Sequence, residues 1–460
     1  MKIKRILIVI ALLLGISCNL LSRVPPSVSP LIPVTGLTAT PSAAAADVYI
    51  PPECVGKPVA TLPAATLEAQ PTPSIVGTNT PLTKDEQLKV FNEITSIIPG
   101  LYVYPNLNGL NWPVTVAKYQ AMIQAGLDTE AFYTQMSNLI AELRDNHSQY
   151  ESPAQVAQAN AELAGHNNYV GIGVEIDQVP EHNVLSVLLD FPGSSAEHAG
   201  LKPHDNLLAV DGLPLVQNGV GRPEMIRGPA CSAAVLTVQT PGGKPRDVTV
   251  IRYDVQSYIP IIAQMVTTRD GSRIGYIFLP SFFDDTLAGQ VKQALQRFGN
   301  LDGLIIDNRM NPGGSSNVVE PILSYFTEGT LGHFVSRTSS DPVGVKADPI
   351  NNSQTVPMVV LVGKDTHSFG EIFSGIMQDI GRAKVVGQTT PGNVEILESH
   401  VFSDGSRLWL AEARFVELHS TADWEKTGII PDVTAYAGWD TFTFANDPSI
   451  AAAVKLLGHN

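Results

Sequence analysis

The run from Val356 to Val362 constrains the fold of this 460-residue chain more than any other feature. It contains no polar residue and ends at Gly363. A strand without polar and apolar alternation is typical of a parallel sheet that helices cover on both faces. Strands predicted at 274–279 and 304–307, with a helix over 284–297, alternate around it. The pattern therefore predicts an α/β domain over residues 256–460.

Two other kinds of structure precede this domain. Over residues 82–166 the pattern is helical, and Asp128 is placed to cap a helix that ends shortly before His147. Over residues 167–255 the pattern changes to short strands separated by glycine turns, with clear alternation from Val184 to Leu189. We expect a helical region followed by a small β-rich domain.

The first 81 residues have the composition of an export signal and a tether. Residues 1–18 combine three basic residues with a twelve-residue apolar run, which as a helix is about 18 Å long and too short to span a bilayer. The run ends at Cys18 in a segment that resembles a bacterial lipobox, although Gly15 stands where leucine is usual, so that lipidation of Cys18 and plain cleavage are both open. Residues 19–81 hold twelve of the 34 prolines and predict a disordered linker.

Charge and cysteine content exclude several classes of protein. The formal net charge is −15 with scattered basic residues, whereas nucleic-acid binding needs clustered Lys and Arg. The three cysteines show no spacing typical of a zinc site, and no organic cofactor motif occurs, so we expect no metal and no cofactor. If Cys18 is lipidated, Cys54 and Cys231 either pair or stay unpaired; the sequence leaves both open.

Ser368 lies where the apolar strand ends and a new helix begins. A serine at such a turn is exposed for nucleophilic attack, and the N–H groups of the helix start can stabilise an oxyanion. A lone serine there is more often a helix cap. The glycine pair Gly313–Gly314, which follows another strand, adds a second place where backbone N–H groups can approach a substrate closely.

The order of motifs resembles that of the C-terminal processing peptidases, also called tail-specific proteases. The matching segments are Ile306–Gly314 ("IDNRMNPGG"), Thr366–Glu371 around Ser368, Ile380–Gly387, Asp404–Ser406 and Gly428–Asp432. The segment over 168–254 resembles a PDZ domain of bacterial proteases. The resemblance implies a mixed α/β protein: a crotonase/ClpP-like protease core at 256–460, an inserted PDZ domain at 167–255 and an N-terminal helical region at 82–166.

One position departs from the family. The processing peptidases use a Ser/Lys dyad, and here Asn393 stands at the position of the lysine and cannot act as a base. The tricorn-like branch of the family uses His and Glu, and on that resemblance His147 and Glu425 take the roles of general base and orienting acid for Ser368. His367, Lys364 and Lys384 are weaker alternatives as the base.

The resemblance also implies the binding elements. The oxyanion would be held at Gly313, Gly314 and the N–H of Phe369. The turn of Gly171, Ile172 and Gly173 would receive a peptide terminus at the edge of the PDZ sheet.

We therefore expect an exported serine endopeptidase that cleaves unstructured or PDZ-captured polypeptides, held on the outer face of the cell membrane by Cys18, or secreted or periplasmic without lipidation. An inactive peptide-binding scaffold and an esterase on the same core are the alternatives. The oligomeric state and the natural substrate stay open.

Overall fold

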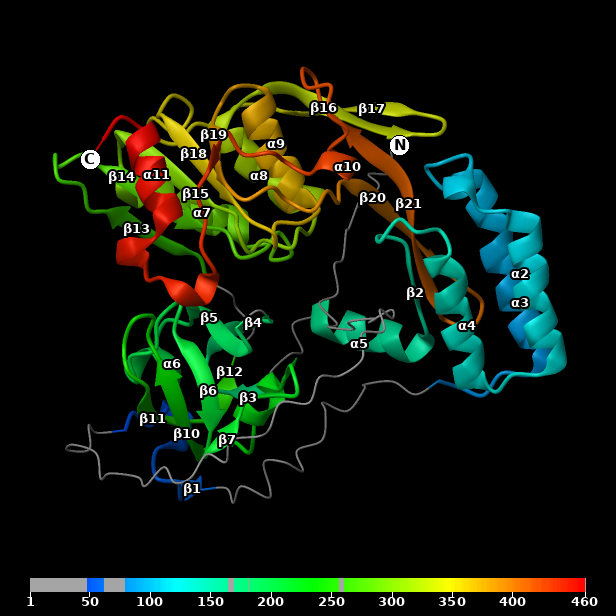
Figure 1. The fold of residues 1–460 in the computed structure, drawn as a ribbon, viewed down its shortest axis with the longest axis horizontal. Helices are drawn as coiled ribbons and strands as arrows, with labels where there is room; N and C mark the ends of the chain where they lie inside the picture. The colour runs from blue at the N-terminus through cyan, green and yellow to red at the C-terminus, as the bar shows by residue number, and fades with distance from the viewer. Residues whose placement is uncertain (1–47, 62–78, 164–168, 181, 256–259, 460) are drawn as a thin grey trace, which may run out of the picture.

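A computed structural model describes residues 48–61, 79–163, 169–180, 182–255 and 260–459. Three parts are visible in Figure 1: a core of sheets and helices, a β domain below it, and a helical region beside it. The predicted signal segment, with Cys18, lies outside the described residues. No helix in the described ranges is both long and apolar enough to cross a membrane.

The helical region contains four helices, and the first three share a buried cluster with the core. Its elements are α2 (Lys84–Leu101), α3 (Trp112–Ala125), α4 (Thr129–Ala141) and the separate α5 (Pro153–Leu163). The predicted cap is confirmed, because Asp128 accepts a hydrogen bond from the N–H of Ala131 at 2.8 Å. The apolar face of α4 is buried, including Phe132 and Met136.

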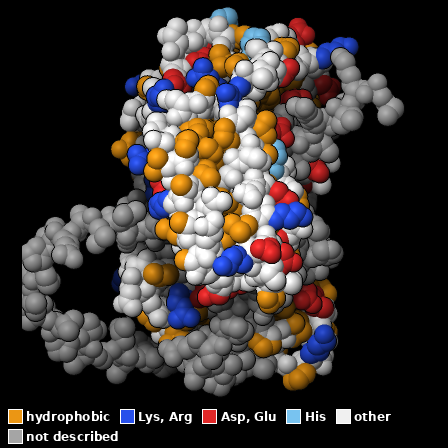
Figure 2. Space-filling model, turned by 90° about the vertical axis from the view of Figure 1, so that its right-hand side faces the viewer, with side chains coloured by type: hydrophobic (Ala, Val, Ile, Leu, Met, Phe, Trp, Pro, Cys, Tyr) orange, Lys and Arg blue, Asp and Glu red, His pale blue; other side chains and the backbone are white. Residues whose placement is uncertain are grey.

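The outer face of this region is partly apolar. Figure 2 shows this side of the molecule, with hydrophobic side chains gathered in a band over its middle. On α3, Val114 is 63% exposed and Met122 is 36% exposed. The buried residues of α3 are Thr115, Tyr119 and Ile123, which keep a spacing of four and form the adjoining face of the helix.

The β domain is a separate β-rich unit, as predicted. Its main sheet has the order β1-β10-β6-β5-β4, with β11 paired to β10 and β7 paired to β6. The strands of this sheet are β1 (Ala60–Thr61), β4 (Val174–Val179), β5 (Val184–Asp190), β6 (Asn206–Val210), β7 (Leu213–Pro214), β10 (Ser232–Gln239) and β11 (Arg246–Ile251). Two further pairs lie outside it: β3 (Tyr169–Gly171) with β12 (Tyr253–Val255), and β8 (Val216–Gln217) with β9 (Val220–Gly221). Most of its buried residues form a cluster of their own, whereas Leu189, Phe191 and Val255 belong to a cluster shared with the core. Its assignment as a PDZ domain stays a prediction.

The core is built on a six-stranded sheet of order β13-β14-β15-β18-β19-β22. All neighbouring pairs are parallel except β13–β14. The strands are β13 (Ile262–Val266), β14 (Ile274–Phe278), β15 (Gly303–Asp307), β18 (Met358–Val362), β19 (Lys384–Gly387) and β22 (Val433–Thr434). The helices are α7 (Leu287–Phe298), α8 (Ser316–Phe326), α9 (Phe369–Asp379), α10 (Trp424–Thr427) and α11 (Pro448–Leu456).

The central strand explains why its sequence is wholly apolar. Val360 and Val362 of β18 belong to the buried cluster that contains α7, α8 and α9, whereas Val359 and Leu361 belong to a cluster that contains α11. Both faces of the strand are therefore covered, as the sequence predicts. The predicted helix at 284–297 begins later, at Leu287, because Asp284 accepts a hydrogen bond from Thr286 N–H in the preceding turn.

A second sheet joins the helical region to the core. Its order is β17-β16-β21-β2, and β20 also pairs with β21. Its strands are β2 (Gln149–Glu151), β16 (Gly329–Ser336), β17 (Ser340–Val345), β20 (Glu395–Val401) and β21 (Arg407–Val416). Because β2 follows directly after His147, this pairing carries His147 to the core.

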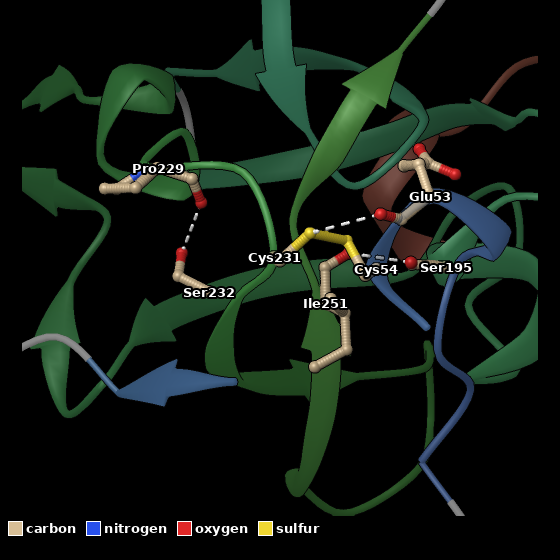
Figure 3. The surroundings of a disulfide bond; sticks show 7 residues. All are labelled: Glu53, Cys54, Ser195, Pro229, Cys231, Ser232 and Ile251. Atoms are coloured by element: carbon tan, nitrogen blue, oxygen red, sulfur yellow. Dashed lines mark hydrogen bonds between the residues drawn. A yellow bond between two sulfur atoms is a disulfide. The ribbon is translucent and has the colours of Figure 1, made fainter. Parts of the chain in front are cut away.

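The prediction of a disordered linker over 19–81 is wrong for residues 48–61. Pro52–Cys54 form a 3₁₀ turn, and Ala60–Thr61 pair in parallel with β10 as strand β1. A disulfide joins Cys54 to Cys231 at the start of β10 (Figure 3). This covalent bond and the ring of Tyr49, stacked on His198 at 3.7 Å, hold in place a proline-rich segment that composition alone predicts to be disordered.

Candidate active site

Ser368 heads helix α9 in a strained conformation. Its φ is 53° and its ψ is −125°, values that residues other than glycine rarely adopt. The side chain does not cap the helix, and the buried Oγ atom has no hydrogen-bond partner in the described structure. The reading of Ser368 as an ordinary helix cap is therefore wrong, and the geometry is that of a presented nucleophile.

The loop before Ser368 is fixed by the loop that follows β15. Thr366 Oγ1 donates to the carbonyl of Asn308 at 2.8 Å, and His367 N–H donates to the carbonyl of Asn311 at 2.9 Å. Asn308 in turn donates through Nδ2 to the carbonyl of Gly370 at 2.7 Å. Two segments of the predicted family motifs thus hold each other, and with them the strained serine.

Gly313 and Gly314 lie against this loop, as expected for oxyanion elements. A Cβ on Gly313 would be 2.6 Å from Ser368 Cβ and 3.1 Å from Phe369 N, and a Cβ on Gly314 would be 2.1 Å from the backbone of Phe282. Both have positive φ, 100° and 146°. The N–H of Gly313 already donates to Asn311 Oδ1 at 2.9 Å, so that an oxyanion would share or replace this bond.

His147 is held at the entrance to β2 by an Asp-stabilised turn. Asp145 accepts hydrogen bonds from the N–H of His147 at 3.0 Å and from the N–H of Ser148 at 2.8 Å. The residue is only 8% exposed. It is not the solvated loop histidine that a position after a helix suggests.

The carboxylate that meets His147 is Glu395, a residue that sequence reasoning missed. Its Oε2 lies 3.1 Å from His147 Nδ1, and the side chains are 6% and 1% exposed. The predicted partner, Glu425, lies beside this pair: one ligand atom from each of the three residues lies within 4.8 Å of the others. The available signal was a glutamate inside an otherwise apolar run at 394–397.

The carboxyl group of Glu425 has a raised proton affinity. Burial, followed by the charge of Glu395, raises the pKa of Glu425 to about 9, although its Oε2 accepts a hydrogen bond from Val394 N–H at 2.8 Å. Glu425 therefore holds a proton at neutral pH. Glu395 is then the carboxylate that can orient the imidazole and stabilise its protonated form.

The Nε2 of His147 is buried and has no hydrogen-bond partner in the described structure, like Ser368 Oγ. His147 and the helix that begins after Ser368 share one environment, since the charge of His147 adds to burial in lowering the pKa of His367. It also acts on Glu371, whose pKa is raised mainly by burial. The fold thus brings together residues that are 221 positions apart in sequence.

Glu371 and the segment around Asn393 complete the wall of the site. Glu371 Oε1 accepts hydrogen bonds from Thr390 Oγ1 at 2.5 Å and from Gly392 N–H at 2.8 Å. The segment in which the family carries its lysine is thereby held in place, and two residues after Asn393 it supplies Glu395. Lys384 pairs with Asp432 at 2.8 Å and is committed elsewhere.

The predicted peptide-binding turn lies in the β domain. The carbonyl of Ile172 accepts a bond from Ala196 N–H at 3.0 Å, and a Cβ on Gly173 would be 2.4 Å from Ser194 Cβ. Gly171 ends β3, and the turn leads into β4 at the edge of the sheet. A cavity of about 310 Å³ separates β4 from the core, lined by Asp177 and Gln178 on one side and by Lys364 and Asp365 on the other.

A strained, buried serine and a histidine held by a carboxylate are the groups that a serine peptidase needs, and the comparisons point to the same class of enzyme. Residues 273–435 match the model of Peptidase family S41. A carboxyl-terminal-processing protease of Synechocystis sp. is 30% identical over 393 residues, 82% of this chain and 89% of that protein. One from Picosynechococcus sp. is 29% identical over 338 residues, 72% of this chain and 79% of that protein.

The chain belongs to the family of the carboxyl-terminal-processing proteases, as its motifs predict. The solved structure of a photosystem II D1 C-terminal processing protease aligns with a TM-score of 0.51 at 23% identity, over 77% of this chain and 93% of that one. This match confirms the mixed α/β fold. The site residues themselves rest on the geometry given above.

Proposed function

We propose that the protein is an exported serine endopeptidase in which Ser368 is the nucleophile, His147 the general base and Glu395 the residue that orients His147. The observation that carries the proposal is the contact of 3.1 Å between His147 Nδ1 and Glu395, with His147 Nε2 and Ser368 Oγ both buried and free of other partners in the described structure. Glu395 takes the role that the sequence pattern assigned to Glu425.

The reaction proceeds in two halves. Ser368 Oγ attacks the peptide carbonyl as His147 Nε2 takes its proton, and the oxyanion is stabilised by N–H groups at Phe369 and at the Gly313–Gly314 turn. His147 then protonates the leaving amine, and the acyl-enzyme forms. Water, activated by the same imidazole, releases the acid. Asn393 takes no part in these proton transfers, which explains how the family lysine can be absent.

The β domain supports the capture of an unstructured polypeptide. In the described structure β4 pairs only with β5, which leaves an edge to which an extended peptide can add as a strand. The cavity beside β4 is bordered by Lys364 and Asp365, which precede Ser368 by four and three residues. A chain held at β4 has a short path to the nucleophile.

Export is favoured by the N-terminal signal and by the disulfide. Cysteine pairs such as Cys54–Cys231 persist in oxidising compartments outside the cytosol. Lipidation of Cys18 would place the enzyme on the outer face of the cell membrane.

The test is covalent labelling of the full-length protein with a fluorophosphonate, read by intact mass, together with hydrolysis of an unstructured polypeptide. We expect one adduct on the wild type and none on Ser368→Ala or His147→Ala, with both variants folded by circular dichroism. A folded wild type that neither labels nor cleaves, even with peptide present, would instead identify an inactive peptide-binding scaffold, the reading that Asn393 motivates.

A further inference from the structure

The cluster of His147, Glu395 and Glu425 contains one more carboxyl group than a catalytic histidine needs. One carboxylate suffices to orient an imidazole. Here two converge, from the start of β20 and from α10, and one atom of each lies within 4.8 Å of one His147 nitrogen and of the other carboxylate. The second carboxylate has no evident part in the proton transfers described above.

One oxygen atom of this three-residue cluster also lacks a hydrogen bond. The side chain of Glu395 is 1% exposed, and its Oε1 has no hydrogen-bond partner in the described structure. The Tyr104 phenol approaches this carboxylate, and its hydrogen bond to Glu395 adds to burial in raising the pKa of Tyr104. A buried carboxylate oxygen without a partner is costly, and a cation would relieve that cost and allow Glu425 to ionise beside Glu395.

Imidazole with two carboxylates is a ligand set that suits Zn²⁺, whereas Mg²⁺ and Ca²⁺ prefer oxygen ligands alone. Ligand distances of about 2.0–2.2 Å require the three side chains to draw closer than they lie here. Glu425, the least buried of the three, can supply that movement. Its Oε2 already accepts a bond from Val394 N–H, which would orient it as a ligand.

We propose that His147, Glu395 and Glu425 bind one Zn²⁺ ion, and that the bound ion reversibly stops peptide hydrolysis. The inhibitory part rests on the proposed function. A metal at Nδ1 takes the lone pair there, and the imidazole proton moves to Nε2. Nε2 then donates a hydrogen bond and cannot accept the proton of Ser368. The proton held by Glu425 passes to solvent as the ion binds.

Binding is measured first, apart from activity. Full-length Ser368→Ala protein, which retains all three ligands, is titrated with ZnCl₂ by calorimetry; we expect one ion per chain. Adding Glu425→Gln or, separately, Glu395→Gln should weaken binding at least tenfold. The two amides are near-isosteric, and circular dichroism and thermal melts confirm folding.

A matched control is provided by His400 and Glu412, a second His–Glu contact of 2.5 Å that lies nearer the surface. Glu412→Gln in the same background should leave the zinc affinity unchanged, and MgCl₂ or CaCl₂ should not displace zinc. An equal loss of zinc affinity in the Glu412 and Glu425 variants would contradict the proposed site. So would an unchanged zinc affinity in the Glu395 and Glu425 variants.

Hydrolysis by the wild type is then measured with ZnCl₂ and after EDTA. Inhibition that follows the calorimetric affinity and is reversed by EDTA supports the whole proposal. An active enzyme that binds zinc at these residues yet is not inhibited overturns the inhibitory step. An enzyme that is inactive even in EDTA, but binds zinc as expected, supports the site and counts against the proposed function instead.

Discussion

Two histidine–glutamate pairs that each include a residue of β20 differ in burial and in the groups around them. His147 meets Glu395 on β20, and His400 of β20 meets Glu412 on β21. The first pair is 6% and 1% exposed, and the second 27% and 18%. Among the described residues only the first has a further carboxylate beside it, and its second ring nitrogen, His147 Nε2, is buried without a hydrogen-bond partner. Burial and the surrounding groups therefore distinguish the pair proposed to act in catalysis from a contact near the surface.

The largest difference should appear in catalysis when each histidine is removed. His147→Ala should lower kcat/KM for an unstructured polypeptide at least about a thousandfold, because the nucleophile loses its base. His400→Ala should change it less than twofold. Steady-state hydrolysis by the folded variants measures both values. A similar loss of kcat/KM in the two variants would show that the pairs do not differ in their role in catalysis.

Removing the carboxylates should give the next largest effect. Glu395→Gln should lower kcat by about a hundredfold or more with little change in KM, since the amide can hold the wrong imidazole tautomer and cannot stabilise its charge. Glu412→Gln is the control and should stay near wild type. Because Glu395 acts through His147, the pH profile of kcat should shift in the first variant only; an unshifted profile would point to a merely structural role.

The pH dependence of the unfolding free energy should also differ between the two pairs, because Glu425 lies beside the first pair. The folded state keeps a proton on Glu425 up to about pH 9, whereas the unfolded chain releases it near 4.5. The unfolding free energy should therefore fall as pH rises between these values. Glu425→Gln removes this slope and should gain on the order of 2 kcal/mol over wild type between pH 5 and 9, since one pKa unit equals about 1.4 kcal/mol and partial exposure reduces the effect.

Urea unfolding at pH 5, 7 and 9 measures this gain. For the control variant Glu412→Gln, the unfolding free energy should change with pH in the same way as for wild type. Parallel curves for Glu425→Gln as well would show that its carboxyl titrates normally.

The smallest effect concerns the stability contribution of the outer pair. His400→Ala should change the unfolding free energy by less than about 1 kcal/mol, since partly exposed ion pairs contribute little. Thermal and urea unfolding at pH 7 check this value. A larger loss would mean that the contact between β20 and β21 depends on this pair more than its exposure suggests.

Much of the scaffold could be predicted because it depends on local patterns. The apolar β18 run, the Asp128 cap and the alternation in β5 each reflect burial or capping within a few residues. The fold of residues 48–61 could not be predicted in this way. It depends on a partner 177 positions away, Cys231, and composition contains no record of that contact.

The residues of the candidate site also fall into those that local motifs predict and those that depend on distant contacts. Ser368, Gly313 and Gly314 lie in motifs with a recognisable order, and they do meet in the structure. Glu395 has no motif, and its role appears only when β2 and β20 take their places beside β21. Glu425 was found by its motif, but which of two neighbouring carboxylates contacts His147 is decided by side-chain geometry of a few ångströms.

The Cys54–Cys231 bond determines what a single cut in the polypeptide would do. Cleavage between residues 55 and 230 leaves two fragments joined by that bond, so an enzyme tethered through Cys18 would stay on the membrane. Cleavage before Cys54 would shed the catalytic unit in one piece. For a cut before Cys231, release from the cell surface is thus limited to the stretch that separates Cys18 from Cys54, unless a reductant opens the disulfide.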